Sequence, residues 1–196
     1  MDLTQGTPEQ KHARSKTMML WFGILSLIMS FAALTSAFIV SSKRDDWLDD
    51  FQLPDAFLVS LGIILLSSLS LFIAKYNLKR NKLKMITFWV AITIVLGVIF
   101  INNQFTGFNQ IIDKGYNFTG PTSNITMSYI YLIAALHIGH VIVALICLIV
   151  VLIQSLKKRY NSGNMLGFDL AANFWHFVDL LWLYLFLFLY FFRYII

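Results

Sequence analysis

The stretch Ala171–Ile196, AANFWHFVDLLWLYLFLFLYFFRYII, decides the fold of this chain. It is almost wholly apolar and long enough to cross a membrane as a helix, because a hydrocarbon core of about 30 Å takes about 20 apolar residues. Yet it contains His176 and Asp179, and an ionisable side chain in lipid costs about 2.5–3.5 kcal/mol on insertion scales. The stretch therefore predicts a membrane helix with one face turned away from the lipid tails.

The composition of the whole chain agrees with this interpretation. Of the 196 residues, 58% are hydrophobic and 13% are charged, and the mean hydropathy is +0.71. Soluble domains have about 25% charged residues, so a water-soluble protein is excluded. The net charge of +5 is then no sign of nucleic-acid binding, and the distribution of charge along the chain matters more.

Five apolar segments are long enough to span a bilayer. Strands of a membrane barrel would instead alternate apolar and polar residues over about 10 positions, whereas these segments are apolar on every face. We therefore predict an all-α integral membrane bundle of five transmembrane helices, with residues 1–16 as a cytoplasmic tail and 17–196 as a single membrane domain. The predicted spans are Thr17–Val40, Ala56–Ala74, Met85–Phe105, Met127–Ile153 and Leu170–Tyr194.

The charges in the connecting loops predict the orientation. Eleven lysines and arginines lie in the N-terminal tail and in the second and fourth loops, and four lie on the other side, which also carries an acidic cluster. Because basic loops remain in the cytoplasm, the N-terminus should be cytoplasmic and the C-terminus periplasmic. The acidic cluster consists of Asp45, Asp46, Asp49, Asp50 and Asp55.

Polar residues of the last span share one helical face. Asp169, Asn173, His176 and Asp179 are spaced by 4, 3 and 3 residues, with Trp175 and Trp182 beside them. Such a stripe suits a binding site or a proton relay, and equally a hydrogen-bonded network that fixes helix packing. A stand-alone membrane transporter or proton channel using His176 and Asp179 is therefore an alternative function. Against it, all three prolines lie outside the spans, whereas many transporters have broken helices.

The fourth span contains His137 and His140, three residues apart. A haem with two histidine ligands needs them on two helices, and zinc or copper needs three or four converging ligands. The spans contain only three histidines, and the single cysteine, Cys147, lies in an apolar run. We predict no metal site and no catalytic residue in this chain.

Two blocks of the sequence resemble subunit III of the haem-copper respiratory oxidases. The first is GFDLAANFWHFVDLLWLYLFLFLYFF (Gly167–Phe192), with its Gly-Phe-acid start, its Trp-His-Phe-Val-Asp core and a following Trp. The second is LHIGHVIVAL (Leu136–Leu145), which is similar to the family's His-x-x-His-Val segment. The resemblance extends over residues 17–194 and matches the shorter, five-helix bacterial form.

The resemblance implies a function. The chain would be a non-redox subunit of a cytochrome c or quinol oxidase in the bacterial inner membrane, with haem and copper held by partner subunits. It would pack on the catalytic subunit I, bind phospholipid and stabilise the complex during oxygen reduction and proton pumping. A lipid-binding or inter-subunit polar network would then comprise His137, His140, Asp169, Asn173, Trp175, His176, Asp179 and Trp182.

The chain also departs from the family pattern. The family usually has a Ser-Glu pair in its first shared helix, and the aligned pair here is Ser26-Leu27. The Thr-Gly that often precedes the first histidine of the fourth span is Ala134-Ala135. The missing carboxylate bears on any proton handling through the first helix.

Overall fold

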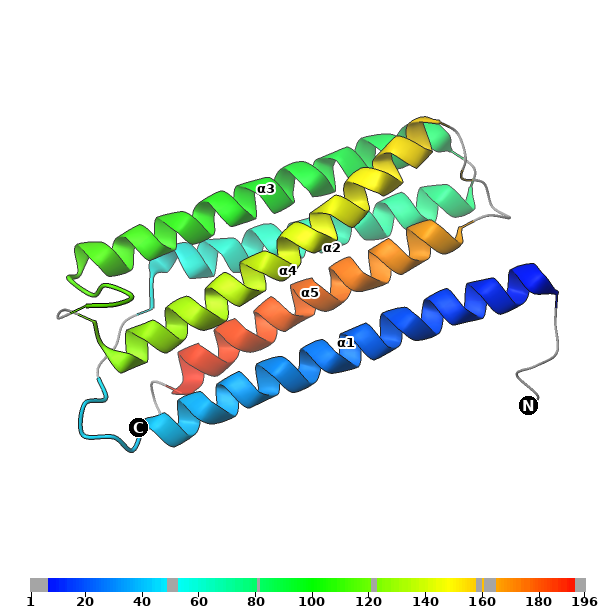
Figure 1. Cartoon of the computed structure of the whole chain (residues 1–196). Helices are drawn as coiled ribbons and strands as arrows, with labels where there is room; N and C mark the ends of the chain where they lie inside the picture. The colour runs from blue at the N-terminus through cyan, green and yellow to red at the C-terminus, as the bar shows by residue number, and fades with distance from the viewer. Residues whose placement is uncertain are drawn as a thin grey trace.

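Five long helices make up the fold (Figure 1). The computed structural model describes residues 7–48, 53–80, 82–120, 123–157, 160 and 165–192. All five helices are long and apolar enough to cross a membrane, so the predicted all-α bundle of five membrane helices is confirmed. Their bounds are α1 Pro8–Ser41, α2 Asp55–Lys79, α3 Leu83–Asp113, α4 Ile125–Leu156 and α5 Leu166–Phe192.

Each helix is longer than the apolar run that predicted it. The clearest case is α1, which begins at Pro8 and so includes part of the segment predicted as a tail as well as the predicted span Thr17–Val40. Thr7 caps this helix by a reciprocal pair of hydrogen bonds with Gln10, of 3.4 and 3.3 Å, and proline is favoured at the first helical position. Hydropathy marks only the part of a helix that lies in lipid, so it missed this polar first part of α1.

Helices α2 to α5 form a closed ring, and α1 lies at its edge. α2 packs on α3, α3 on α4, α4 on α5, and α5 on α2, while α1 lies along α5 and α4 (Figure 1). α1 contacts the bundle mainly in its last turns. There the Thr35 hydroxyl oxygen lies 3.3 Å from that of Tyr184, and the Ser41 hydroxyl oxygen lies 2.9 Å from that of Tyr129. Only four of its described residues are buried: Ile24, Phe31, Thr35 and Phe38.

Two glycines let α3 approach its neighbours closely. A Cβ atom on Gly97 would lie 2.7 Å from the Trp175 ring and 2.7 Å from Leu145, and one on Gly107 would lie 2.5 Å from the Phe57 ring. Without a hydrophobic force between helices in lipid, small residues and close packing drive association. Gly97 thus sets the distance between α3 and the first tryptophan of α5.

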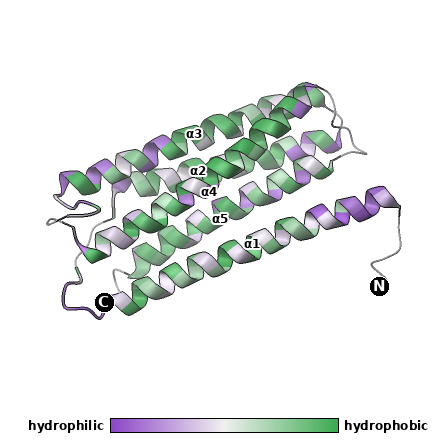
Figure 2. Ribbon diagram, viewed as in Figure 1, coloured by the Kyte–Doolittle hydropathy of each residue, from purple (hydrophilic) through white to green (hydrophobic). Residues whose placement is uncertain are grey.

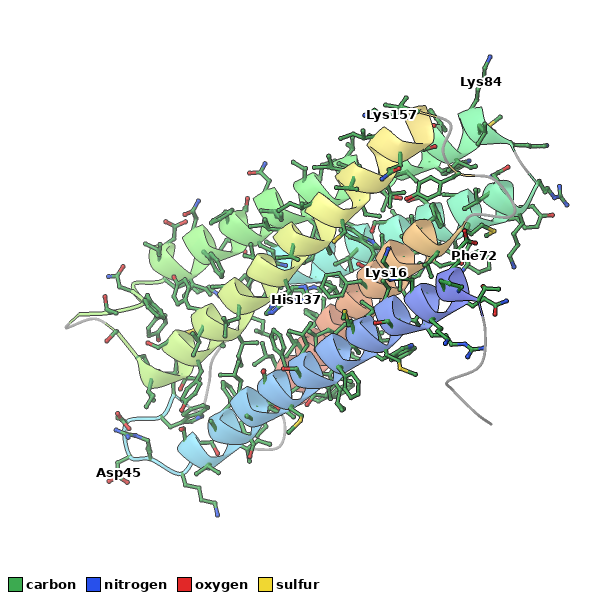
Figure 3. The ribbon with its side chains drawn as sticks, turned by 45° about the vertical axis from the view of Figure 1, so that its right-hand side comes forward. Lys16, Asp45, Phe72, Lys84, His137 and Lys157 are labelled. Carbon is green, nitrogen blue, oxygen red and sulfur yellow. The ribbon has the colours of Figure 1, made fainter. Side chains whose placement is uncertain are left out.

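The two ends of the bundle carry opposite charge. Apolar residues cover the middle of the helices and polar ones gather at the ends (Figure 2). Lys84 and Lys157 lie at one end, which we call the basic end, and Asp45 lies at the other, the acidic end (Figure 3). At the acidic end the Arg44 guanidinium hydrogen-bonds Asp46 and lowers the pKa of its carboxyl. Asp49, Asp50, Lys158, Arg159 and Arg193, which entered the sequence-based charge count, lie outside the described residues.

Candidate functional site

The two tryptophans of the predicted network are buried against different helices. Trp175 is 1% exposed, and its indole N–H donates to the Ser67 hydroxyl of α2 at 2.9 Å. Trp182, also 1% exposed, lies between the rings of Phe57 and Phe100, each centred 5.5 Å from it. These residues therefore join α5 to α2 and α3 in the bundle core.

His137 lies in the core beside Trp182 (Figure 3). Its side chain is fully buried, and its ring centroid is 5.0 Å from Trp182, 5.8 Å from Phe100 and 6.5 Å from Phe31. Neither ring nitrogen has a hydrogen-bond partner among the described residues. This histidine thus packs as one ring of an aromatic cluster that draws on four helices, α1, α3, α4 and α5.

Gln104 of α3 is a buried polar residue that the sequence analysis missed. It is fully buried, and its amide nitrogen and oxygen have no partner among the described residues. It follows Phe100 by four residues and precedes Gly107 by three, which places all three on the buried face of α3. That spacing from Phe100 and Gly107, at the end of the third apolar segment, was the signal that could have found it.

His140 is in a different environment from His137. It is half-buried; its Nδ1 donates to the Leu136 carbonyl at 2.7 Å, and its ring is centred 5.7 Å from that of Phe31. Leu27 of α1 is half-buried and precedes Phe31 by one turn. The described residues contain no group of three or more His, Cys, Asp or Glu that could hold a metal ion.

The polar stripe of α5 divides into separate contacts. Asp169 pairs with Lys75 of α2, with 2.8 Å between Oδ1 and Nζ. The His176 Nδ1 lies 2.6 Å from the Ser68 hydroxyl of α2, so its partner is a serine and not Asp179. Asn173 is exposed on the surface of this chain.

Asp179 is the buried member of that stripe. It is 3% exposed, and neither carboxylate oxygen has a hydrogen bond of standard geometry with the described residues, although Ser68 approaches it. Asp169, Asn173, His176 and Asp179 therefore share a helical face but do not form one continuous hydrogen-bonded line. This arrangement suits a set of inter-helix contacts better than a proton relay along α5.

Comparison with known proteins places these residues in a family. The family model described as cytochrome c oxidase subunit III matches residues 5–194. Cytochrome c oxidase subunit 3 of Alkalihalophilus pseudofirmus is 27% identical, with 95% of this chain and 93% of that protein covered. The protein of the same name from Bacillus sp. strain PS3 is 31% identical, covering 69% of this chain and 64% of the relative. A probable quinol oxidase subunit 3 of Staphylococcus saprophyticus is 27% identical, covering 69% and 66% respectively.

Proposed function

Because this chain belongs to the cytochrome c oxidase subunit III family, we propose that it is a structural subunit of a terminal haem-copper oxidase. It packs on the catalytic subunit I, binds phospholipid and keeps the complex intact while oxygen is reduced and protons are pumped. One observation carries this proposal. The residues that resemble the family most closely, among them His137, Trp175 and Trp182, are buried where the helices of this chain meet, as expected of residues that shape a scaffold.

In this proposal the haem and copper belong to partner subunits. The histidines that could serve as ligands have other environments: His137 is enclosed by aromatic rings, His140 bonds its own helix, and His176 bonds Ser68. Each lacks the second and third converging ligand that a metal site needs among the described residues. The role of the chain is then packing and lipid contact.

Small residues exposed on the bundle surface support docking on another membrane protein. On α4, Ala135 and Gly139 are exposed and four residues apart, and a Cβ on Gly139 would meet no atom within 4 Å. On α1, Ala32 and Ser36 are likewise exposed and four residues apart. Such positions let helix backbones approach closely in lipid, and within this chain they contact no other helix closely enough to be buried.

The same proposal includes the cell location and orientation. The chain is a multi-pass protein of the bacterial plasma membrane, with the basic end in the cytoplasm and the acidic end in the periplasm. The excess of basic residues at the end that holds Lys84 and Lys157 supports it (Figure 3), because basic loops stay on the cytoplasmic side. The start of α1 then lies in the cytoplasm and the end of α5 in the periplasm.

Deleting the gene tests the proposal. The oxidase from the deletion strain should keep its haem spectrum and its initial rate of oxygen reduction, because this chain holds no redox centre. It should lose activity sooner during continuous turnover, and expressing this chain should restore the longer active period. Loss of the haem spectrum or of the initial rate in an assembled enzyme would contradict a structural role, and an unchanged active period would contradict the stabilising role.

A further inference from the structure

Three polar side chains in the core of the bundle have no hydrogen-bond partner among the described residues. They are Gln104 of α3 and His137 of α4, which are fully buried, and Trp182 of α5, which is 1% exposed. Both amide atoms of Gln104, both ring nitrogens of His137 and the indole nitrogen of Trp182 are unpartnered in this part of the chain. Buried polar groups in proteins are nearly always hydrogen-bonded, either to protein or to ordered water.

The register of two helices places Gln104 at the same depth as Trp182. α3 and α5 run in the same direction, from the basic end to the acidic end (Figure 1). Gly97 of α3 lies against Trp175 of α5, because a Cβ on Gly97 would be 2.7 Å from the indole ring. Gln104 follows Gly97 by seven residues, and Trp182 follows Trp175 by seven. Seven residues are about two turns, or about 10 Å along either helix, so the second pair repeats the juxtaposition of the first.

Ring contacts bring His137 to the same place. The ring centroid of His137 lies 5.0 Å from that of Trp182 and 5.8 Å from that of Phe100, and the latter two are 5.5 Å apart. Gln104 follows Phe100 by one turn on the buried face of α3. The three unpartnered side chains therefore converge inside the closed ring of α2 to α5, each from a different helix.

The chemistry of these groups favours a small neutral ligand. The Trp182 indole offers only a donor, the Gln104 amide offers both donors and an acceptor, and a neutral His137 offers one of each. A metal ion is a poor fit, because the five atoms include one oxygen and the neighbouring rings of Phe57 and Phe100 supply no ligand. Water both donates and accepts, and buried waters make about three hydrogen bonds to polar groups that otherwise lack a partner.

We propose that one water molecule is bound between Gln104, His137 and Trp182. It accepts the indole N–H of Trp182, and it donates to the amide oxygen of Gln104 and to the unprotonated ring nitrogen of His137. The water thereby joins α3, α4 and α5 by hydrogen bonds in apolar surroundings, where such bonds are stronger than in bulk water. The site lies within this chain, so it does not depend on which complex the chain joins.

Magnetisation transfer from water to the tryptophan indole protons tests this site. It is measured by proton-detected solid-state NMR on the full-length chain in deuterated bilayers, after assignment of the indole signals. At short mixing times the Trp182 indole proton should show a cross-peak with water. Trp175 is the internal control: it is equally buried at 1% exposure but donates directly to Ser67 at 2.9 Å, so its indole proton should show none.

Substitutions of the other two residues extend the test. Gln104→Leu removes the amide with little change in volume, and it should abolish the water cross-peak of Trp182. His137→Phe keeps a ring in place and should abolish it as well. The matched control is Gln110→Leu, the same substitution on the same helix at a residue that accepts from the backbone N–H of Ala56, and it should leave the cross-peak unchanged.

Three results would overturn the site. A wild-type Trp182 without the cross-peak would show that no water is bound there. Equal cross-peaks at Trp175 and Trp182 would show general entry of water into the core. A cross-peak that persists in folded Gln104→Leu would exclude the bridge to α3. The wild-type comparison of the two indoles decides between the first two of these outcomes and the bound water without any variant.

Discussion

Gly97 offers the sharpest test of how α3, α4 and α5 pack. In Gly97→Ala the new Cβ would lie 2.7 Å from Cη2 of Trp175 and 2.7 Å from Cδ2 of Leu145. The indole is held in place, because Trp175 is 1% exposed and bonds Ser67 at 2.9 Å. Overpacking of this kind costs about 1–3 kcal/mol, and the better helix propensity of alanine returns up to about 1 kcal/mol. We expect a net loss of about 1–2 kcal/mol.

The matched control is Gly139→Ala on α4, where the new methyl group meets no atom within 4 Å. The substitution then changes only helix propensity, which is better for alanine than for glycine. The free energy of unfolding should therefore rise by up to about 1 kcal/mol. For a chain of this size the loss at Gly97 corresponds to a fall in Tm of about 2–8 °C. The assay is thermal unfolding of the detergent-solubilised chain, followed by the monomer peak in size-exclusion chromatography. A Gly97→Ala protein as stable as Gly139→Ala would refute the close approach of α3 to Trp175.

Three further predictions concern the membrane topology, the buried Asp179 and the span of α1. Single cysteines at Lys84 and Asp45, in a Cys147→Ser background, should be labelled from opposite sides of the membrane; labelling of both from one side would contradict the orientation. Asp179→Asn should leave the initial oxidase rate and haem spectrum unchanged, because the polar residues of α5 do not form one continuous hydrogen-bonded line that could carry a proton. An immediate loss of rate in an assembled enzyme would favour a proton relay. A carbodiimide should leave α1 unmodified within the membrane, because its span Thr17–Val40 contains no Asp or Glu, and a labelled peptide from this span would contradict the prediction.

The sequence predicted the fold because hydropathy and length are properties of each segment alone. It predicted helix ends less well: the capping box at Thr7 begins α1 within a polar stretch that carries no hydropathy signal. It also identified which residues of α5 share a face, and Trp175, Asp179 and Trp182 are buried as that spacing suggests.

The sequence could not predict which residues of other helices contact these side chains. Spacing within α5 says nothing about which residues of α2 lie opposite, and the adjacent serines Ser67 and Ser68 bond different residues, Trp175 and His176. The pairing of Asp169 with Lys75 likewise joins residues almost a hundred positions apart. Asn173 shares the polar face yet is exposed, because a helical face about 100° wide includes both buried positions and positions at the surface.

Purification of the tagged chain from its native membrane tests the central claim most directly. In mild detergent the chain should co-purify with a haem-bearing subunit at a fixed ratio of the two chains, and the haem should be seen in the reduced-minus-oxidised spectrum of the complex. After the partners are stripped in harsher detergent, the chain alone should show no Soret absorption. A chain that purifies without any haem protein, or one that keeps stoichiometric haem by itself, would contradict the account of a non-redox subunit of a terminal oxidase.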